Sequence, residues 1–78
     1  SKKIFEGDII RQLYSQYQSF DITGAVRFNK AGRFVVEHVW TAEQNPWQKG
    51  KKQEFDIPLY CEIIGNVYDN PELLEAQP

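Results

Sequence analysis

The chain has 78 residues, of which 41% are hydrophobic and 26% charged, with a net charge of −2. This size predicts a single domain over residues 1–78, and the charge balance argues against strong non-specific nucleic-acid binding, which needs a basic face. With one cysteine and one histidine, and no run near the about 20 apolar residues of a membrane span, we expect no disulfide, no metal, no cofactor and no membrane contact.

The first third of the chain predicts two strands. Residues 9–14 (IIRQLY) are rich in β-branched and aromatic side chains, which favour a strand. They follow a corner in which Gly7 supplies the backbone geometry and Asp8 caps the turn. Residues 22–29 alternate apolar and polar positions with the period of two that is typical of a half-buried strand.

A β-hairpin is predicted in the middle of the chain. The sequence NKAG at 29–32 is a turn signal in which Gly32 provides a positive φ angle. The returning strand is expected over residues 33–40. His38 lies in that strand with no second histidine or paired cysteine, so we interpret it as a structural histidine and not as a general base.

Residues 41–54 lack apolar periodicity and predict an exposed loop. The loop contains an aromatic residue beside three lysines: Trp47, Lys49, Lys51 and Lys52. This is the minimal pattern for stacking a nucleic-acid base while neutralising phosphates. Two other interpretations stay open. Trp47 folds back onto the domain within a solvated loop, or it anchors a protein partner.

A second aromatic group stands in the Ser/Gln-rich link between the first two strands. It consists of Tyr14, Tyr17 and Phe20. Such residues either form a stacking platform at the rim of a small barrel or close the barrel end, and we favour closure.

The last part of the chain predicts two more strands and a helical turn. Residues 54–59 have strand character, although Pro58 confines them to an edge or to the end of a strand. Residues 62–68 form the final strand, in which Gly65 marks a bulge or a close backbone approach. Residues 69–74 read as a helix start.

Two further features of this region have structural interpretations. Cys61 precedes the acidic Glu62, which opposes thiolate formation, so an inert, buried thiol is expected. Leu73 and Leu74 either contact a partner or plug an open barrel end, and we favour the plug. Taken together, the short strands predict an all-β fold, a small five-stranded, partly open SH3-like barrel with a short C-terminal helical turn.

Two segments resemble one protein family. The opening KIFEGDII at 3–10 is similar to a signature of the YopX-like proteins of bacteriophages and prophages, and EIIGNVYDNPELL at 62–74 resembles the family's ending almost residue for residue. The central hairpin fits as well. Family members usually carry a further N-terminal segment, so the chain is expected to be a short member or the C-terminal domain of a longer protein.

The resemblance implies a small β-rich phage or prophage protein in the cytoplasm of a host bacterium, with no catalytic residues to carry over. We therefore expect a non-enzymatic module that binds a host or phage protein, with a homo-oligomer as a further possibility. The alternative is a weak single-stranded nucleic-acid-binding protein that uses Trp47 with the three lysines of its loop.

Overall fold

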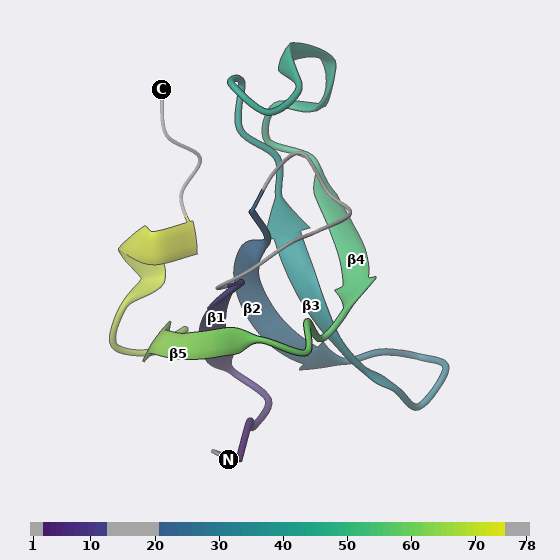
Figure 1. The fold of residues 1–78 in the computed structure, drawn as a ribbon, viewed down its shortest axis with the longest axis vertical. Helices are drawn as coiled ribbons and strands as arrows, with labels where there is room; N and C mark the ends of the chain where they lie inside the picture. The colour runs from purple at the N-terminus through teal and green to yellow at the C-terminus, as the bar shows by residue number, and fades with distance from the viewer. Residues whose placement is uncertain (1–2, 13–20, 75–78) are drawn as a thin grey trace.

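The computed structural model describes residues 3–12 and 21–74. Within these ranges the chain forms one antiparallel sheet of five strands: β1 (Asp8–Gln12), β2 (Thr23–Phe28), β3 (Phe34–Val39), β4 (Lys52–Asp56) and β5 (Cys61–Asn66). Their only helical elements are two short 3-10 turns, η1 (Pro46–Gln48) and η2 (Pro71–Leu74) (Figure 1). The predicted all-β class is confirmed, and no helix in the described ranges is long and apolar enough to cross a membrane.

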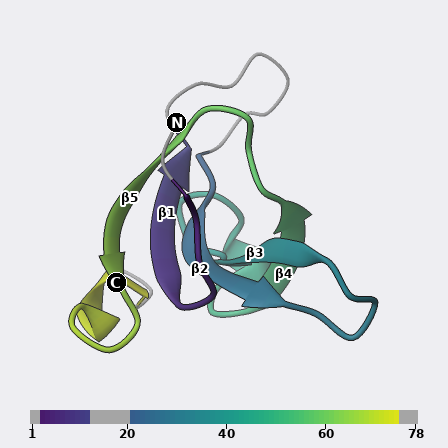
Figure 2. The same ribbon diagram turned by 90° about the horizontal axis from the view of Figure 1, so that it is seen from below.

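The sheet is strongly curled. Its strand order is β4-β3-β2-β1-β5, so β4 and β5 are neighbours in the chain but lie at opposite edges of the sheet. Edge strands of a flat five-stranded sheet would lie about 19 Å apart. The chain from Asp56 to Cys61 spans at most about 18 Å when extended. The sheet therefore bends so that residues 57–60 cross its concave side, as Figure 2 shows, while the two edge strands stay unpaired with each other.

The hydrophobic core lies on this concave side. It consists of the buried residues Ile10, Ile22, Val26 and Val36. Half-buried hydrophobic side chains surround it: Ile4, Phe55, Ile57, Cys61 and Ile63. The two predicted strands of the central hairpin are confirmed, and one residue of each, Val26 or Val36, belongs to this core. Burial does not follow the predicted period of two, because Gly24, Ala25 and Val26 are buried in succession.

The convex side of the sheet is also partly covered. Ile9, Ala25 and Val35 are buried there, although a half-buried hairpin was predicted. The turn η2 contacts β2, and its half-buried Leu74 lines a shallow groove of about 370 Å³ together with Ala25. The C-terminal turn thus covers part of the convex face of β2, which the sequence pattern predicted to face solvent.

The observed boundaries of β4 differ from the prediction. The strand begins at Lys52, not at residue 54, and ends at Asp56, not at residue 59. Pairing with β3 sets the start, because Lys52 lies opposite Val39. The end lies shortly before Pro58, which has no N–H group to donate to a ladder. Lys52 is therefore a strand residue and does not belong to the loop predicted over 41–54.

The bounds of β1 and β5 also differ from the prediction: β1 begins at Asp8, and β5 runs from Cys61 to Asn66 instead of over residues 62–68. β1 ends at Gln12, and the last predicted residues of that strand lie outside the described ranges. The register between β1 and β5 shifts between Ile9, which faces Gly65, and Ile10, which faces Ile63. This register skips Ile64, so the ladder is irregular directly beside Gly65, in agreement with the first of the two alternatives predicted there, a bulge or a close backbone approach.

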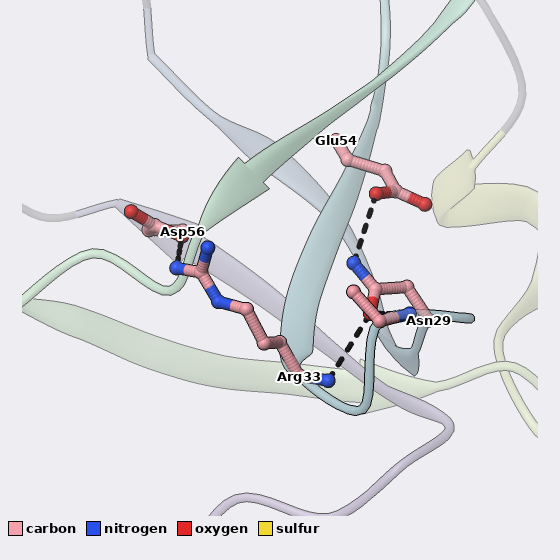
Figure 3. Close-up of polar contacts among 5 residues, drawn as sticks. Asn29, Arg33, Glu54 and Asp56 are labelled. Carbon is pink, nitrogen blue, oxygen red and sulfur yellow. Dashed lines mark hydrogen bonds and ion pairs between the residues drawn. The ribbon is translucent and has the colours of Figure 1, made fainter.

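Side chains in the turn between β2 and β3 contact the edge strand β4. Asn29 Oδ1 accepts hydrogen bonds from the backbone N–H groups of Ala31 and Arg33, while Asn29 Nδ2 donates to Glu54. The Arg33 guanidinium forms an ion pair with Asp56 (Figure 3). Gly32 has the predicted positive φ, 80°. Side chains of β4 therefore hold the turn between β2 and β3 in place, in addition to the backbone pairing of β4 with β3.

Candidate binding loop

The segment between β3 and β4 is a closed hairpin end. The Trp40 N–H donates to the Lys51 carbonyl over 2.9 Å, and the Gly50 N–H donates to the Trp40 carbonyl over 2.9 Å. Gly50 has a φ of 81°, a left-handed conformation that glycine adopts without strain. These two bonds continue the sheet ladder to the base of the loop that carries Trp47.

Local side-chain capping fixes Trp47 itself. Asn45 precedes η1, and its Oδ1 accepts a hydrogen bond from the Trp47 N–H at 3.1 Å. Pro46 occupies the first position of the turn, where its missing N–H costs nothing. The Gln48 N–H donates to the Asn45 carbonyl over 2.9 Å. The sequence Asn-Pro-Trp thus forms a capped turn with a defined backbone.

A buried histidine connects this loop to the sheet. His38 is only 2% exposed, and its Nε2 lies 2.9 Å from Oε1 of Gln44. The same Gln44 oxygen accepts the Thr41 N–H, while the Gln44 amide donates to the carbonyl of Asp21. His38 Nδ1 lies against the backbone of Thr23. The sequence-based view of His38 as a structural residue fits this packing. The role of Gln44 was missed, because a polar residue in a loop has no periodicity to reveal it.

The structure leaves Trp47 in solvent. Its side chain is 89% exposed, so it does not fold back onto the domain. Lys49 and Lys51 are also exposed and lie on the same loop. Lys52 is separated from them, because it belongs to β4 and its Nζ lies 3.6 Å from Oε1 of Glu37. Of the predicted group, Trp47, Lys49 and Lys51 therefore lie in the segment between β3 and β4, and Lys52 lies in β4.

Acidic side chains reduce the positive charge beside this loop. Glu37 Oε1 lies 3.6 Å from Lys52 and 3.5 Å from Arg27, so one carboxylate bridges two cations on the convex side. Within the described residues, Lys49 and Lys51 form no ion pair. A surface with two such cations neutralises only a few phosphates.

The remaining candidates from the sequence are three aromatic residues and the single cysteine. Tyr14, Tyr17 and Phe20 lie outside the described residues. Cys61 is half-buried, and desolvation raises the pKa of its thiol, in agreement with an unreactive side chain. Among the described residues, no cluster of three or more His, Cys, Asp or Glu side chains is arranged to hold a metal ion.

One aromatic pair escaped sequence reasoning. Phe28 and Phe34 flank the β2–β3 turn, with ring centroids 5.0 Å apart in an edge-to-face arrangement, and both are exposed. Their cross-strand pairing explains the contact. Phe28 lies two residues after the buried Val26, and Phe34 lies two residues before the buried Val36. The sequence pattern therefore predicts that both rings lie in the core.

These features define a small, curled β-sheet domain that presents a fixed loop with an exposed tryptophan. The family model described as YopX protein matches residues 1–75, and the chain belongs to this family. The resemblance inferred from residues 3–10 and 62–74 is thereby confirmed. No curated protein and no solved structure shows significant similarity to the chain.

Proposed function

We propose that this protein is a non-enzymatic protein-interaction module in which Trp47 anchors the partner. The observation that supports this most directly is the 89% exposure of the Trp47 side chain on a loop whose backbone is fixed by hydrogen bonds. Tryptophan is enriched among residues that dominate binding energy. A loop whose backbone is already fixed loses little conformational freedom when a partner covers it.

The size of the side chain gives an expected effect. Burying about 200 Å² of a tryptophan at about 25 cal/mol per Å² corresponds to about 5 kcal/mol before the costs of association are counted. Replacing Trp47 with alanine is therefore expected to weaken the complex by about 2 kcal/mol or more, which is about thirtyfold in affinity.

The setting of this interaction follows from the family. We propose that the chain acts in the cytoplasm of a bacterial host and that the partner is a host or phage protein. A homo-oligomer is a further possibility. For the fold, we propose that the curled sheet is a small, partly open SH3-like barrel, because residues 57–60 cross between its two edge strands. An experimental structure of the chain tests that assignment.

Affinity capture with a matched control tests the function. Tagged wild-type chain, Trp47→Ala and Tyr68→Ala are used as baits in nuclease-treated bacterial lysate, and retained proteins are quantified by mass spectrometry. Tyr68 is 87% exposed but lies in the turn after β5, far from the loop in the sequence. We expect a discrete protein that Tyr68→Ala retains and Trp47→Ala loses. A protein profile that is the same for both variants contradicts the proposal.

Nucleic-acid binding is the second candidate, favoured by exposed Lys49 and Lys51 beside Trp47. Its mark is quenching of Trp47 fluorescence by a single-stranded oligonucleotide, with an affinity that falls steeply with salt. Trp40 also fluoresces, so the titration is repeated with Trp47→Phe, which must abolish the quenching. Absence of quenching in wild-type protein at low salt rejects this candidate.

A further inference from the structure

We infer that the partner anchored by Trp47 adds an antiparallel strand to the free edge of β4. This inference rests on the proposed function, because it specifies where the same partner continues beyond the loop. The partner contributes an extended polypeptide segment that has basic residues in its N-terminal half and an acidic residue in its C-terminal half.

Among residues 3–12 and 21–74, no strand pairs with the outer edge of β4. Four of the five residues of β4 are exposed, whereas all six residues of β5, the opposite edge, are half-buried. An unpaired edge strand carries a row of N–H and C=O groups that can pair with another chain. Peptide recognition by strand addition uses such edges. Of the two edges, β4 is therefore the accessible one.

The hydrogen-bond pattern shows which backbone groups face outward. The Trp40 N–H donates to the Lys51 carbonyl, and the Trp40 carbonyl accepts from the Gly50 N–H, so Trp40 occupies a hydrogen-bonded position toward β4. Such positions alternate along an antiparallel ladder. Pairing with β3 thus uses the backbone groups of Gln53 and Phe55. The N–H and C=O groups of Lys52, Glu54 and Asp56 point away from β3, toward the free edge. They form the regular set of donors and acceptors that an added strand needs.

Charge determines the direction and composition of that strand. The β4 edge and the loop before it run from lysines to carboxylates: Lys49, Lys51 and Lys52, followed by Glu54 and Asp56. Side chains directly opposite each other in antiparallel strands interact, and like charges there are unfavourable. Asp56 is already paired with Arg33, and Lys52 with Glu37. The Glu54 carboxylate, which accepts from the neutral Asn29 amide, therefore determines the register most strongly. An antiparallel segment places a basic residue opposite Glu54, with a second basic residue opposite Asp56 and an acidic residue opposite Lys52.

The same charges argue against a second copy of the chain as the occupant. Antiparallel pairing of two β4 strands about their centres places Lys52 opposite Asp56 at both ends, but it sets Glu54 directly against Glu54 of the second copy. The edge charges thus oppose symmetric self-pairing and leave room for a complementary segment. Such a segment continues directly toward the Trp47 loop, since only residues 49–51 separate η1 from β4 (Figure 1).

Two synthetic peptides test the inference independently of any lysate. The first is acetyl-Thr-Lys-Val-Lys-Val-Glu-Val-Thr-amide, whose lysines face the carboxylates and whose glutamate faces Lys52 in the inferred register. The second has its charges exchanged. Binding to the full chain is followed by NMR chemical shifts and by hydrogen exchange of backbone amides. We expect the first peptide to bind about tenfold more tightly and to protect the amides of Lys52, Glu54 and Asp56.

A pair of variants separates backbone pairing from side-chain loss. Glu54→Pro removes an outward N–H, whereas Glu54→Ala keeps it, and both variants lose the hydrogen bond from Asn29. Pairing with β3 does not use the Glu54 N–H, so the fold is expected to persist, which circular dichroism checks. We expect Glu54→Pro to abolish peptide binding. Glu54→Ala keeps the outward N–H and is expected to bind the first peptide more weakly than wild type, because it loses the carboxylate opposite a peptide lysine.

Each other outcome overturns the inference. Equal affinity for the two peptides excludes the charge register, and no binding at millimolar peptide excludes strand addition at this edge. Protected amides confined to β5 place the added strand at the other edge. A concentration-dependent dimer that Glu54→Pro dissolves identifies a second copy as the occupant. If Glu54→Pro unfolds the chain, the affinities of the two peptides for wild type and for Glu54→Ala still test strand addition at β4. These results concern β4 alone, whereas failure of the proposed function shows as a captured-protein profile that is unchanged in Trp47→Ala.

Discussion

At the scale of single residues, Gln44 connects the Trp47 loop to the sheet. Its side chain accepts from Thr41, donates to the carbonyl of Asp21 and lies 2.9 Å from the ring of His38. A buried polar group is costly when its hydrogen bond is lost. The position of Trp47 therefore depends on a residue that does not itself contact a partner.

Gln44→Ala is expected to lower the free energy of unfolding by about 1–3 kcal/mol, because His38 loses one of its hydrogen bonds. Urea unfolding followed by circular dichroism measures the change. The neighbouring exposed Glu43→Ala is the control and should stay within about 0.5 kcal/mol of wild type. We also expect weaker capture of the Trp47-dependent partner by Gln44→Ala. Equal stability of the two variants would show that this network does not hold the loop.

At the scale of elements, close approach of two backbones fixes the pairing of β2 with β3. A Cβ atom added at Gly24 would lie 2.0 Å from the carbonyl oxygen of Glu37 and 3.2 Å from the Cα of His38. Neither obstacle is a flexible side chain. Gly32, in the turn after β2, has no atom within 4 Å of an added Cβ, but its φ is positive.

Gly24→Ala is expected to destabilise the fold by more than about 3 kcal/mol, because β2 must shift away from β3 to admit the methyl group. Gly32→Ala is the matched variant, and its cost of about 1–2 kcal/mol comes from left-handed backbone strain alone. Thermal unfolding of both proteins measures the difference. A Gly24→Ala protein as stable as Gly32→Ala would rule out the close approach.

At the scale of the whole molecule, one small core carries the stability. A domain of 78 residues is expected to have a free energy of unfolding of about 4–12 kcal/mol. The single cysteine excludes an internal disulfide. Burial on the concave side of the sheet, around Ile10 and Val26, must then supply most of the stabilisation.

Ile10→Val removes one methylene group from a side chain that is fully buried. We expect a loss of about 1 kcal/mol, which lowers the melting temperature by about 4–8 °C in a domain of this size. Ile64→Val, at a half-buried position of β5, is the control and should cost less. Differential scanning calorimetry compares the two. A larger loss of stability in Ile64→Val than in Ile10→Val would show that the cluster around Ile10 is not the centre of the core.

Sequence alone predicted the elements whose signals are local. The strands within residues 22–29 and 33–40, the turn at Gly32 and the irregular pairing beside Gly65 each depend on a few neighbouring residues, and all are present in the structure. Residues 3–10 and 62–74 also carried the family resemblance that the YopX model confirms. The candidate loop was found because Trp47 stands in a polar stretch without periodicity.

Tertiary structure decided what depends on residues far apart in the chain. Lys52 pairs with Val39 and so joins β4, although its own surroundings are polar and suggest a loop. Ala25 is buried because η2 crosses its side of the sheet, and His38 fixes the Trp47 loop only because Gln44 returns to it. Local sequence sets backbone preference and the direction in which side chains point. Which of those side chains then meets solvent, a core or a free edge depends on the curl of the sheet, which arises from all five strands together.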